Sequence, residues 1–257
     1  MYDIAALRLK LKELGVGLCY EKTLPSTNLY LKEKKPPMPT VCLCDLQSAG
    51  CGRNGRAWLP GGITVSYVRE VKGEYPYSLY CGLAAIRALS ETVVPISGEK
   101  TMLPILLKWP NDLVIGGKKL GGILCEGYFC EEKRYMVFGI GLNTDGTAET
   151  FSRRGLPHAA SLAMMGWSLS SVEDFICGLV RQLDAMIAAD AAEREALLAE
   201  YRDVSATIGR EVLLSSPDGE WRDHALDVDR DGRLVLESGK VVVSGEVSVR
   251  GLYEYSE

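Results

Sequence analysis

Apolar residues recur at helical spacing in four parts of the chain. In the clearest case, Val172, Phe175 and Ile176 begin the i, i+3, i+4 pattern of a helix with one buried face. Ser26 precedes another such run as a hydroxyl N-cap, which accepts a hydrogen bond from a free amide of the first turn. The predicted helices cover residues 3–14, 27–33, 76–93 and 172–187, the last continuing with a more polar composition to Tyr201.

Short apolar runs between turn residues predict strands elsewhere. In the first part of the chain they cover residues 17–24, 41–46, 63–68, 105–109, 113–115, 120–129 and 135–140. From about Gly209 only strands remain, at 211–214, 221–228, 234–236 and 241–249, separated by the hairpin dipeptides Asp218-Gly219, Asp231-Gly232 and Ser238-Gly239. We therefore expect an α+β domain with a mixed β-sheet over residues 1–205 and a small β-barrel over residues 206–257.

Composition and charge exclude several classes of protein. A chain of 257 residues with 47% hydrophobic residues can form one large domain and one small one. The net charge of −5, without a long basic tract, argues against a nucleic acid as the main partner. No apolar run is long enough to span a membrane, and no secretory signal opens the chain, so we expect a cytoplasmic protein.

Cysteine and histidine usage narrows the chemistry further. Several of the eight cysteines lie in apolar strand runs, which predicts reduced core thiols rather than disulfides. There is no C-x-x-C pair, and the histidines are His158 and His224 alone. The chain therefore has few of the residues that a zinc site or a serine–histidine–aspartate triad requires.

Residues 47–58 hold the densest candidate chemistry. Glycine allows positive φ and close approach of a ligand, while the arginine fork suits phosphate oxygens. The residues concerned are Gly50, Gly52, Gly55, Arg53, Arg56 and the closing Trp58. The G-x-G-x-x-G spacing does not indicate a dinucleotide fold, because the following Leu59-Pro60-Gly61-Gly62 cannot open a helix. The run predicts an anion cradle, and a solvated surface loop is the alternative.

Four further segments place polar residues where a helix or strand pattern does not need them. They are Ser26-Thr27-Asn28, Lys108-Trp109-Pro110-Asn111-Asp112, Lys118-Lys119-Leu120-Gly121-Gly122-Ile123 and Gly139-Ile140-Gly141-Leu142-Asn143. Each has an ordinary structural explanation: helix capping, an Asx turn, edge lysines in solvent, and a strand end. Taken singly, none of them identifies a function.

In this order, and together with Gln47 and the Gly/Arg run, the segments resemble the biotin protein ligases, the biotin–[acetyl-CoA carboxylase] ligases. The resemblance extends from about residue 17 to residue 251, where 209–212 and 245–250 look like the family's small SH3-like barrel. It implies a class II synthetase-like catalytic domain of the biotin/lipoate ligase type. It also implies an enzyme that condenses biotin with ATP to biotinyl-5′-adenylate and pyrophosphate, then transfers the biotinyl group to a carrier lysine.

The resemblance also implies the site residues. Lys119 and Arg53 would be catalytic, with Lys119 bridging the biotin carboxyl group and the α-phosphate. The biotin pocket would comprise Ser26, Thr27, Asn28, Gln47, Gly50, Cys51, Gly52, Arg53, Lys119 and Gly122. The ATP site would comprise Arg53, Arg56, Trp58, Asn111, Asp112, Lys119 and Asn143, with Asp112 as a ligand of Mg²⁺. Cations suit this reaction, since both the carboxylate and the α-phosphate are negative.

Two positions depart from the family pattern. Cys51 stands where the family usually has arginine, and Asn54 stands where arginine also occurs. The lost charge bears on how tightly the adenylate is retained. The implied partner is a biotin carboxyl carrier protein or domain of a biotin-dependent carboxylase; neither nucleic acid nor membrane is expected, and dimerisation is left open. The short stretch before the first strand predicts no helix-turn-helix module. The alternatives are a lipoate or octanoate ligase or transferase, and a non-catalytic biotin-binding regulator.

Overall fold

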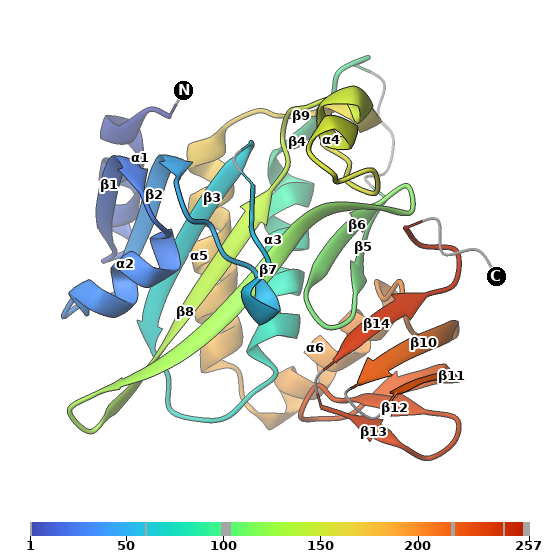
Figure 1. Cartoon of the computed structure of the whole chain (residues 1–257). Coiled ribbons are helices and arrows are strands. Elements are labelled where there is room, and N and C mark those ends of the chain that lie inside the picture. The colour runs from blue at the N-terminus through green and yellow to red at the C-terminus, as the bar shows by residue number, and fades with distance from the viewer. Residues whose placement is uncertain (1, 60, 99–103, 217–218, 244, 254–257) are drawn as a thin grey trace.

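The computed structural model describes residues 2–59, 61–98, 104–216, 219–243 and 245–253. A seven-stranded sheet with helices on both faces is followed by a five-stranded sheet (Figure 1). The helices are α1 (Ile4–Glu13), α2 (Thr27–Lys34), α3 (Tyr77–Thr92), α4 (Ala148–Arg153), α5 (Val172–Ala188) and α6 (Ala191–Asp203), with 3₁₀ turns η1 (Arg53–Gly55) and η2 (Ala163–Met165). The first-part strands are β1 (Gly17–Leu24), β2 (Thr40–Gln47), β3 (Ile63–Glu70), β4 (Val93–Pro95), β5 (Ile105–Lys108), β6 (Asp112–Ile115), β7 (Lys118–Cys130), β8 (Lys133–Leu142) and β9 (Trp167–Leu169).

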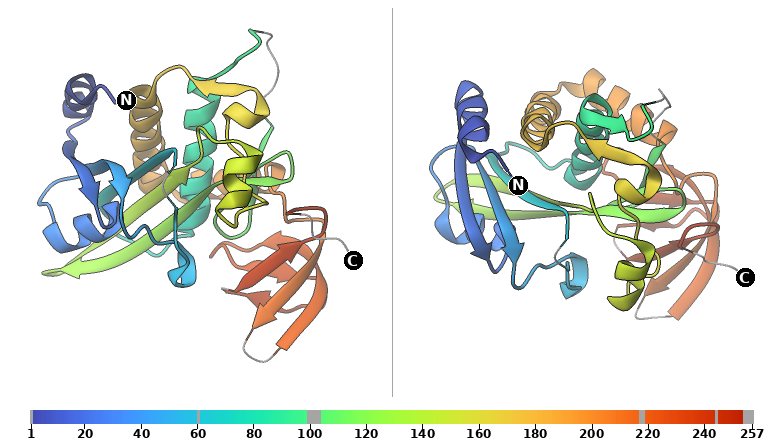
Figure 2. Two further views of the ribbon diagram at one scale, coloured as in Figure 1. Left: turned by 45° about the horizontal axis from the view of Figure 1, so that its top comes forward. Right: turned by 90° about the horizontal axis from the view of Figure 1, so that it is seen from above.

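The large sheet is mixed, as the sequence predicts for an α+β fold. Its strand order is β1-β2-β3-β8-β7-β6-β5, in which β1 and β2 run parallel and the other neighbours are antiparallel. Helices α1, α3, α5 and α6 cover one face, while α2 and the loop that contains η1 lie on the other (Figure 2, right). The main core lies between the sheet and the first group of helices.

The alternation along β3 separates the two faces of this sheet. Ile63, Val65 and Tyr67 are buried toward the helix layer, where the Tyr67 hydroxyl donates to Asp184 Oδ1 of α5 at 2.7 Å. Thr64 and Ser66 point to the opposite face, because successive strand residues alternate. That second face is not covered by the long helices and is free to form a site.

One prediction about the helices needs correction. The helix over 172–187 is confirmed as α5, but its polar continuation is a separate helix, α6. Asp190 and Glu193 form a capping box in which each side chain accepts from the other's backbone N–H, at 2.9 and 2.8 Å. This local cap starts a new helix where the apolar pattern alone suggested continuation. The sequence also gave no signal for α4 or for the β4–β9 pair.

The C-terminal strands form a five-stranded sheet. They are β10 (Glu211–Ser216), β11 (Gly219–Val228), β12 (Leu234–Leu236), β13 (Val241–Val242) and β14 (Glu246–Val249), in the order β13-β12-β11-β10-β14. The single strand predicted over 241–249 is therefore wrong, because its two ends pair with different neighbours. Gly232 and Gly239 have positive φ, as the hairpin dipeptides predicted, whereas Asp218 lies outside the described residues. The SH3-like barrel and the domain boundary at 205/206 stay predictions.

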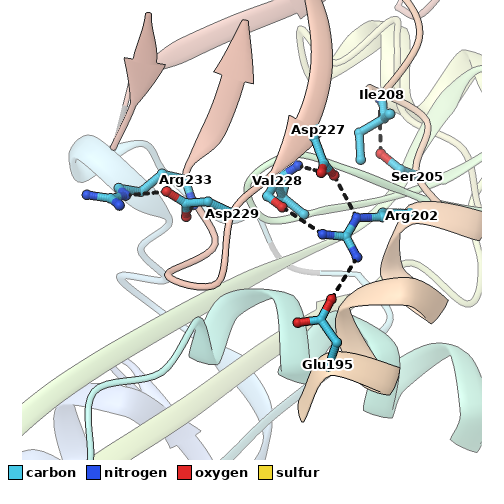
Figure 3. A network of polar contacts seen from close by, with 8 residues as sticks. All are labelled: Glu195, Arg202, Ser205, Ile208, Asp227, Val228, Asp229 and Arg233. Atoms are coloured by element: carbon cyan, nitrogen blue, oxygen red, sulfur yellow. Dashed lines mark hydrogen bonds and ion pairs between the residues drawn. The ribbon is translucent and has the colours of Figure 1, made fainter. Parts of the chain in front are cut away.

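Several contacts fasten this sheet to the first domain. Arg202 of α6 donates to Asp227 Oδ1 at 2.6 Å and to the Val228 carbonyl at 3.2 Å, and it also contacts Glu195 (Figure 3). The buried Trp109 donates its Nε1 hydrogen to the Gly232 carbonyl at 2.9 Å. The small sheet is thus held at a defined position beside the end of the large one.

Two further findings concern the chain as a whole. All eight cysteines are free; Cys42 and Cys44 are buried as expected of core thiols, whereas Cys51 is exposed. Among the described residues, no helix is both long and apolar enough to cross a membrane.

Candidate active site

A cavity of about 560 Å³ opens on the sheet face that the long helices leave uncovered. Its walls come from the start of α2, the Gly/Arg loop, the strands β3, β7 and β8, residues 155–159, and the C-terminal residues 245–248 with Tyr253. Every residue that the sequence assigned to the site lines this cavity, apart from Gly50. Segments far apart in sequence therefore meet at one place, although their roles stay predictions.

Small residues form the floor of the cavity. Ser66 lies opposite Gly139 in the β3–β8 register, and Thr64 lies opposite Gly141, which in turn lies opposite Gly122 of β7. A Cβ at Gly139 would overlap the Asn28 amide, and one at Gly141 would overlap the Trp58 indole. These glycines of the Gly-Ile-Gly segment are thus required by close approach of side chains from other elements.

The end of the cavity near α2 is a neutral hydrogen-bonded cluster, here called the head-group end: Thr27, Asn28, Gln47 and Ser66. Thr27 N and Oγ1 both lie near Gln47 Oε1, at 2.8 and 3.1 Å. Ser66 Oγ lies 2.7 Å from Thr27 Oγ1 and 2.6 Å from Asn28 Oδ1. All four residues are buried, so the cluster is ordered before any ligand arrives. Ser26 caps α2 at Leu29 N, at 3.4 Å, and also lines the cavity.

The Gly/Arg loop folds back on itself to reach the cavity. Gly52 N donates to the Arg56 carbonyl at 2.7 Å, and positive φ at Asn54 and Gly55 closes the turn. Gly50 stands behind the cavity wall, where a Cβ would lie 2.5 Å from the Trp58 carbonyl. Cys51 is exposed, with its thiol 3.2 Å from the Gly52 carbonyl. Gly50 therefore shapes the loop, whereas Cys51 and Gly52 can contact a ligand.

Trp58 reaches from this loop onto the cavity floor. A Cβ at Gly122 would lie 3.4 Å from its Cζ3, and Gly141 is closer still. The indole Nε1 is buried without a hydrogen-bond partner in the described part of the chain. The indole ring therefore packs on the glycine backbone, and its N–H is available to donate a hydrogen bond to a ligand.

The opposite end of the cavity, here called the cationic end, holds Arg53, Arg56, Lys108 and Lys119. Arg53 Nη1 donates to Asn111 Oδ1 at 3.2 Å, and burial lowers the pKa of Arg53. Arg56 forms an exposed ion pair with Glu246 of β14. Asn111 is fixed in turn by donating its Nδ2 hydrogen to the Ile123 carbonyl at 2.9 Å.

Asp112 contacts both Lys119 and Tyr253 at the cationic end. Its Oδ1 lies 2.7 Å from Lys119 Nζ, and its Oδ2 accepts from the Tyr253 hydroxyl at 2.9 Å. Lys108 Nζ stands 4.7 Å from the centre of the Tyr253 ring. Burial lowers the pKa of Lys108 and nearby Asp112 opposes the shift, while burial raises the pKa of Tyr253.

Asn143 and the strand end that carries it organise another wall. Its Nδ2 donates to the Ala160 carbonyl at 3.1 Å, while Lys119 N donates to the His158 carbonyl at 2.8 Å. These bonds hold residues 158–160 against the start of β7. Asn143 lines the cavity from this position, 8% exposed.

Sequence reasoning missed several residues of the site, four of which have polar side chains that matter here. Ser66, Glu246, His158 and Tyr253 all line the cavity. A polar serine inside the apolar run 63–68 was a signal for the first, since a buried strand has no need of it. Glu246 and Tyr253 could not have been found, because their relevance depends on how the second sheet packs.

The described side chains of the cavity do not form a preorganised set of ligands for a divalent metal ion. Among the described residues, no group of three or more histidine, cysteine, aspartate and glutamate side chains could hold an ion. Both oxygens of Asp112 already have partners. Each of these oxygens keeps a second lone pair, so ligation of Mg²⁺ by Asp112 stays a prediction.

Comparisons with known proteins agree on one family. Residues 19–143 match the model of the biotin/lipoate A/B protein ligase family. The biotin–[acetyl-CoA-carboxylase] ligase of Mycobacterium tuberculosis is 33% identical over 220 residues, which cover 80% of this chain and 77% of the relative. The bifunctional ligase/repressor BirA of Escherichia coli is 27% identical over 250 residues, covering 92% of this chain and 75% of the relative.

Solved structures give the same result. The biotin protein ligase of Aquifex aeolicus in complex with biotin and ATP has a TM-score of 0.69 and 26% identity, covering 91% of this chain and 98% of that one. The Leishmania major biotin protein ligase in complex with biotinyl-5-AMP has a TM-score of 0.58 and shares the fold. With a curated relative that is 33% identical over most of both chains, the chain belongs to the biotin protein ligase family.

Proposed function

We propose that this chain activates biotin with ATP to form biotinyl-5′-adenylate and pyrophosphate, then transfers the biotinyl group to a lysine of a biotin carboxyl carrier protein. One observation carries the proposal: a neutral hydrogen-bonding cluster and a cationic cluster line one cavity of about 560 Å³. Biotin has the matching form, with a neutral ureido ring at one end and a carboxylate at the other. The Mycobacterium tuberculosis relative, by its name, acts on acetyl-CoA carboxylase.

The cavity residues divide the work by charge. The head-group end would bind the ureido ring, and the floor of β7 and β8 would support the bicyclic ring. Lys119, beside Asp112, would stand between the biotin carboxylate and the α-phosphate and reduce their repulsion. Arg53 and Arg56 would take the phosphates, each first releasing its present partner.

In the adenylation step, a carboxylate oxygen of biotin attacks the α-phosphorus, and the bond to the β-phosphate oxygen breaks to release pyrophosphate. The cations would hold the charge that accumulates on the phosphoryl oxygens. The acceptor lysine, as a neutral amine, then attacks the biotinyl carbonyl, loses a proton to solvent and releases AMP, which leaves an amide bond. Mg²⁺ would neutralise polyphosphate charge when it accompanies ATP. Trp58 and the loop would keep water from the mixed anhydride.

The test is exchange of labelled pyrophosphate into ATP, run in parallel with biotin and with lipoate. Biotin-dependent exchange is expected, since only reversible adenylation returns the label to ATP. Exchange with lipoate alone would move the chain to the lipoate branch of the family. Binding of biotin without any exchange would instead identify a non-catalytic biotin-binding protein.

A further inference from the structure

The side-chain amide of Asn28 is held in one orientation by a residue outside the cavity wall. Its Nδ2 donates to the Leu124 carbonyl at 3.1 Å and to Glu126 Oε2 at 2.9 Å, which uses both of its hydrogens. Its Oδ1 lies 2.6 Å from Ser66 Oγ. A turned amide would place Oδ1 against a carbonyl and a carboxylate, both acceptors. Glu126 and the Leu124 carbonyl therefore keep the carbonyl end of Asn28 toward the head-group end, and Glu126 is the charged one of these two acceptors.

Glu126 is itself held in place by Lys32. The Lys32 Nζ lies 2.6 Å from Glu126 Oε1, and the two side chains are 32% and 30% exposed. Asn28 and Lys32 stand one helical turn apart on α2 and so share a face. One carboxylate of β7 thus engages two residues of α2, one with each oxygen. Glu126 does not line the cavity and can act on a ligand only through Asn28.

A count of hydrogens shows what this orientation requires. The contacts are Asn28 Oδ1 to Ser66, Ser66 to Thr27, and Thr27 Oγ1 to Gln47 Oε1, at 2.6, 2.7 and 3.1 Å. Thr27 and Ser66 bring one hydroxyl hydrogen each, while both ends of the series are amide oxygens that only accept. The Gln47 oxygen also accepts from Thr27 N at 2.8 Å, which fixes its orientation. Three contacts share two hydrogens, so Asn28 Oδ1 is left with unused acceptor capacity, to which an N–H of a ligand can donate.

We propose that Glu126, clamped by Lys32, is a positioning residue that sets the hydrogen-bond polarity of the head-group end and thereby selects ring ligands that present N–H donors. The inference deepens the proposed function, in which the ring is the cyclic urea of biotin. Without the carboxylate, only the Leu124 carbonyl opposes a turned Asn28 amide, which would direct its Nδ2 toward Ser66. The protein then supplies the missing hydrogen itself, and preference for a ligand N–H is lost.

The experiment compares the wild type with Glu126→Gln, whose amide can face Asn28 with either end. The matched control is Glu70→Gln, which removes an equivalent carboxylate from the Lys133 ion pair (2.9 Å) away from the cavity. Two ligands are titrated calorimetrically without ATP: biotin, and its cyclic carbamate analogue in which oxygen replaces one ureido N–H. Pyrophosphate exchange then gives the KM for biotin, the KM for ATP and kcat.

We expect the wild type to bind biotin about tenfold more tightly than the carbamate, the effect of one lost hydrogen bond in a buried site. In Glu126→Gln, biotin affinity falls about tenfold and the preference falls below about twofold, because the charge-assisted bond to Asn28 is lost. The kcat at saturating biotin and the KM for ATP stay unchanged. The control keeps wild-type affinity and preference.

A retained preference for biotin in Glu126→Gln overturns the proposal, as does equal weakening of both ligands together with a lower melting temperature. Lys32→Met provides a second variant that keeps the glutamate, and we expect a smaller shift in the same direction; no shift in preference counts against the clamp. Because binding is measured without ATP, a protein that binds biotin but does not adenylate it disproves the proposed function while this inference is still tested. A wild type that binds neither ligand disproves both.

Discussion

The two ends of the cavity prepare for a ligand in opposite ways. At the head-group end, Thr27, Asn28, Gln47 and Ser66 are buried and already hydrogen-bonded to one another. At the cationic end, Arg56 and Lys119 are paired with Glu246 and Asp112, in part at the surface. The first end can recognise a neutral ring without rearrangement, whereas the second must exchange its own carboxylates for the carboxylate of biotin and the phosphates of ATP. Specificity and catalysis thus depend on different kinds of order.

The largest effect should come from removing the central cation. Lys119→Ala should lower the rate of adenylation about 10²–10³-fold while leaving biotin binding measurable, because the charge matters most in the transition state. Single-turnover formation of biotinyl-adenylate measures the rate, and calorimetry measures binding. Lys118→Ala, one residue earlier and outside the cavity wall, is the matched control. Near-normal adenylation in Lys119→Ala would remove that residue from the catalytic role.

A second variant would break the head-group end instead. Gly139→Ala should weaken biotin binding about 100-fold, since the new Cβ displaces the Asn28 amide from its hydrogen bonds with Ser66, Leu124 and Glu126. Gly127→Ala lies on the same hairpin, where a Cβ would meet Met136 Cε at an ordinary 3.6 Å. Calorimetric titration of both variants with biotin checks the prediction. Equal affinities would show that Asn28 is not part of the recognition surface.

The contribution of the C-terminal segment is addressed by Tyr253→Phe. This variant keeps the ring near Lys108 but loses the hydrogen bond to Asp112 Oδ2. We expect kcat for adenylation to fall about tenfold, because Asp112 then holds Lys119 less firmly, and biotin affinity to remain unchanged. Steady-state pyrophosphate exchange at saturating biotin and ATP gives the value. A change in biotin affinity instead of kcat would contradict the separation of the two ends.

The smallest effect is expected for Glu246→Gln. Removing the exposed partner of Arg56 should lower the KM for ATP by about twofold, the size typical of a surface ion pair. The difference from wild type should shrink as salt rises from about 0.05 to about 0.5 M, because salt screens exposed charges. An increase in the KM for ATP would mean that Glu246 assists the nucleotide rather than competing with it.

Local patterns were sufficient for most of the fold. The stripe that begins at Val172 predicted α5, and the apolar runs predicted the strands of the large sheet. The run 241–249 was wrong because its ends pair with β12 and β10, a choice made by contacts distant in sequence. The end of α5 was missed because the Asp190–Glu193 cap competes with a continuous apolar pattern.

In the site, too, residues that belong to local motifs could be predicted, whereas residues that depend on contacts distant in sequence could not. Residues carried by motifs, such as Asn28 and Lys119, could be assigned from the sequence by resemblance, and they line one cavity. In the sequence, Glu126 looked like an ordinary residue of a strand. Only the structure shows that its side chain reaches Asn28 of α2. Tyr253 has no motif, and its contact with Asp112 exists only because the second sheet is fastened beside the first.

The position of Trp58 means that the cavity already contains an aromatic ring. Its indole lies on the bare backbone of Gly122 and Gly141, so a flat ligand group that settles there must replace it. Binding of such a ligand then displaces the indole ring of Trp58 into surroundings of different polarity. Trp167 is buried in the main core outside the cavity wall and would report no such change. The emission of Trp58 therefore provides a built-in optical signal for the arrival of substrate.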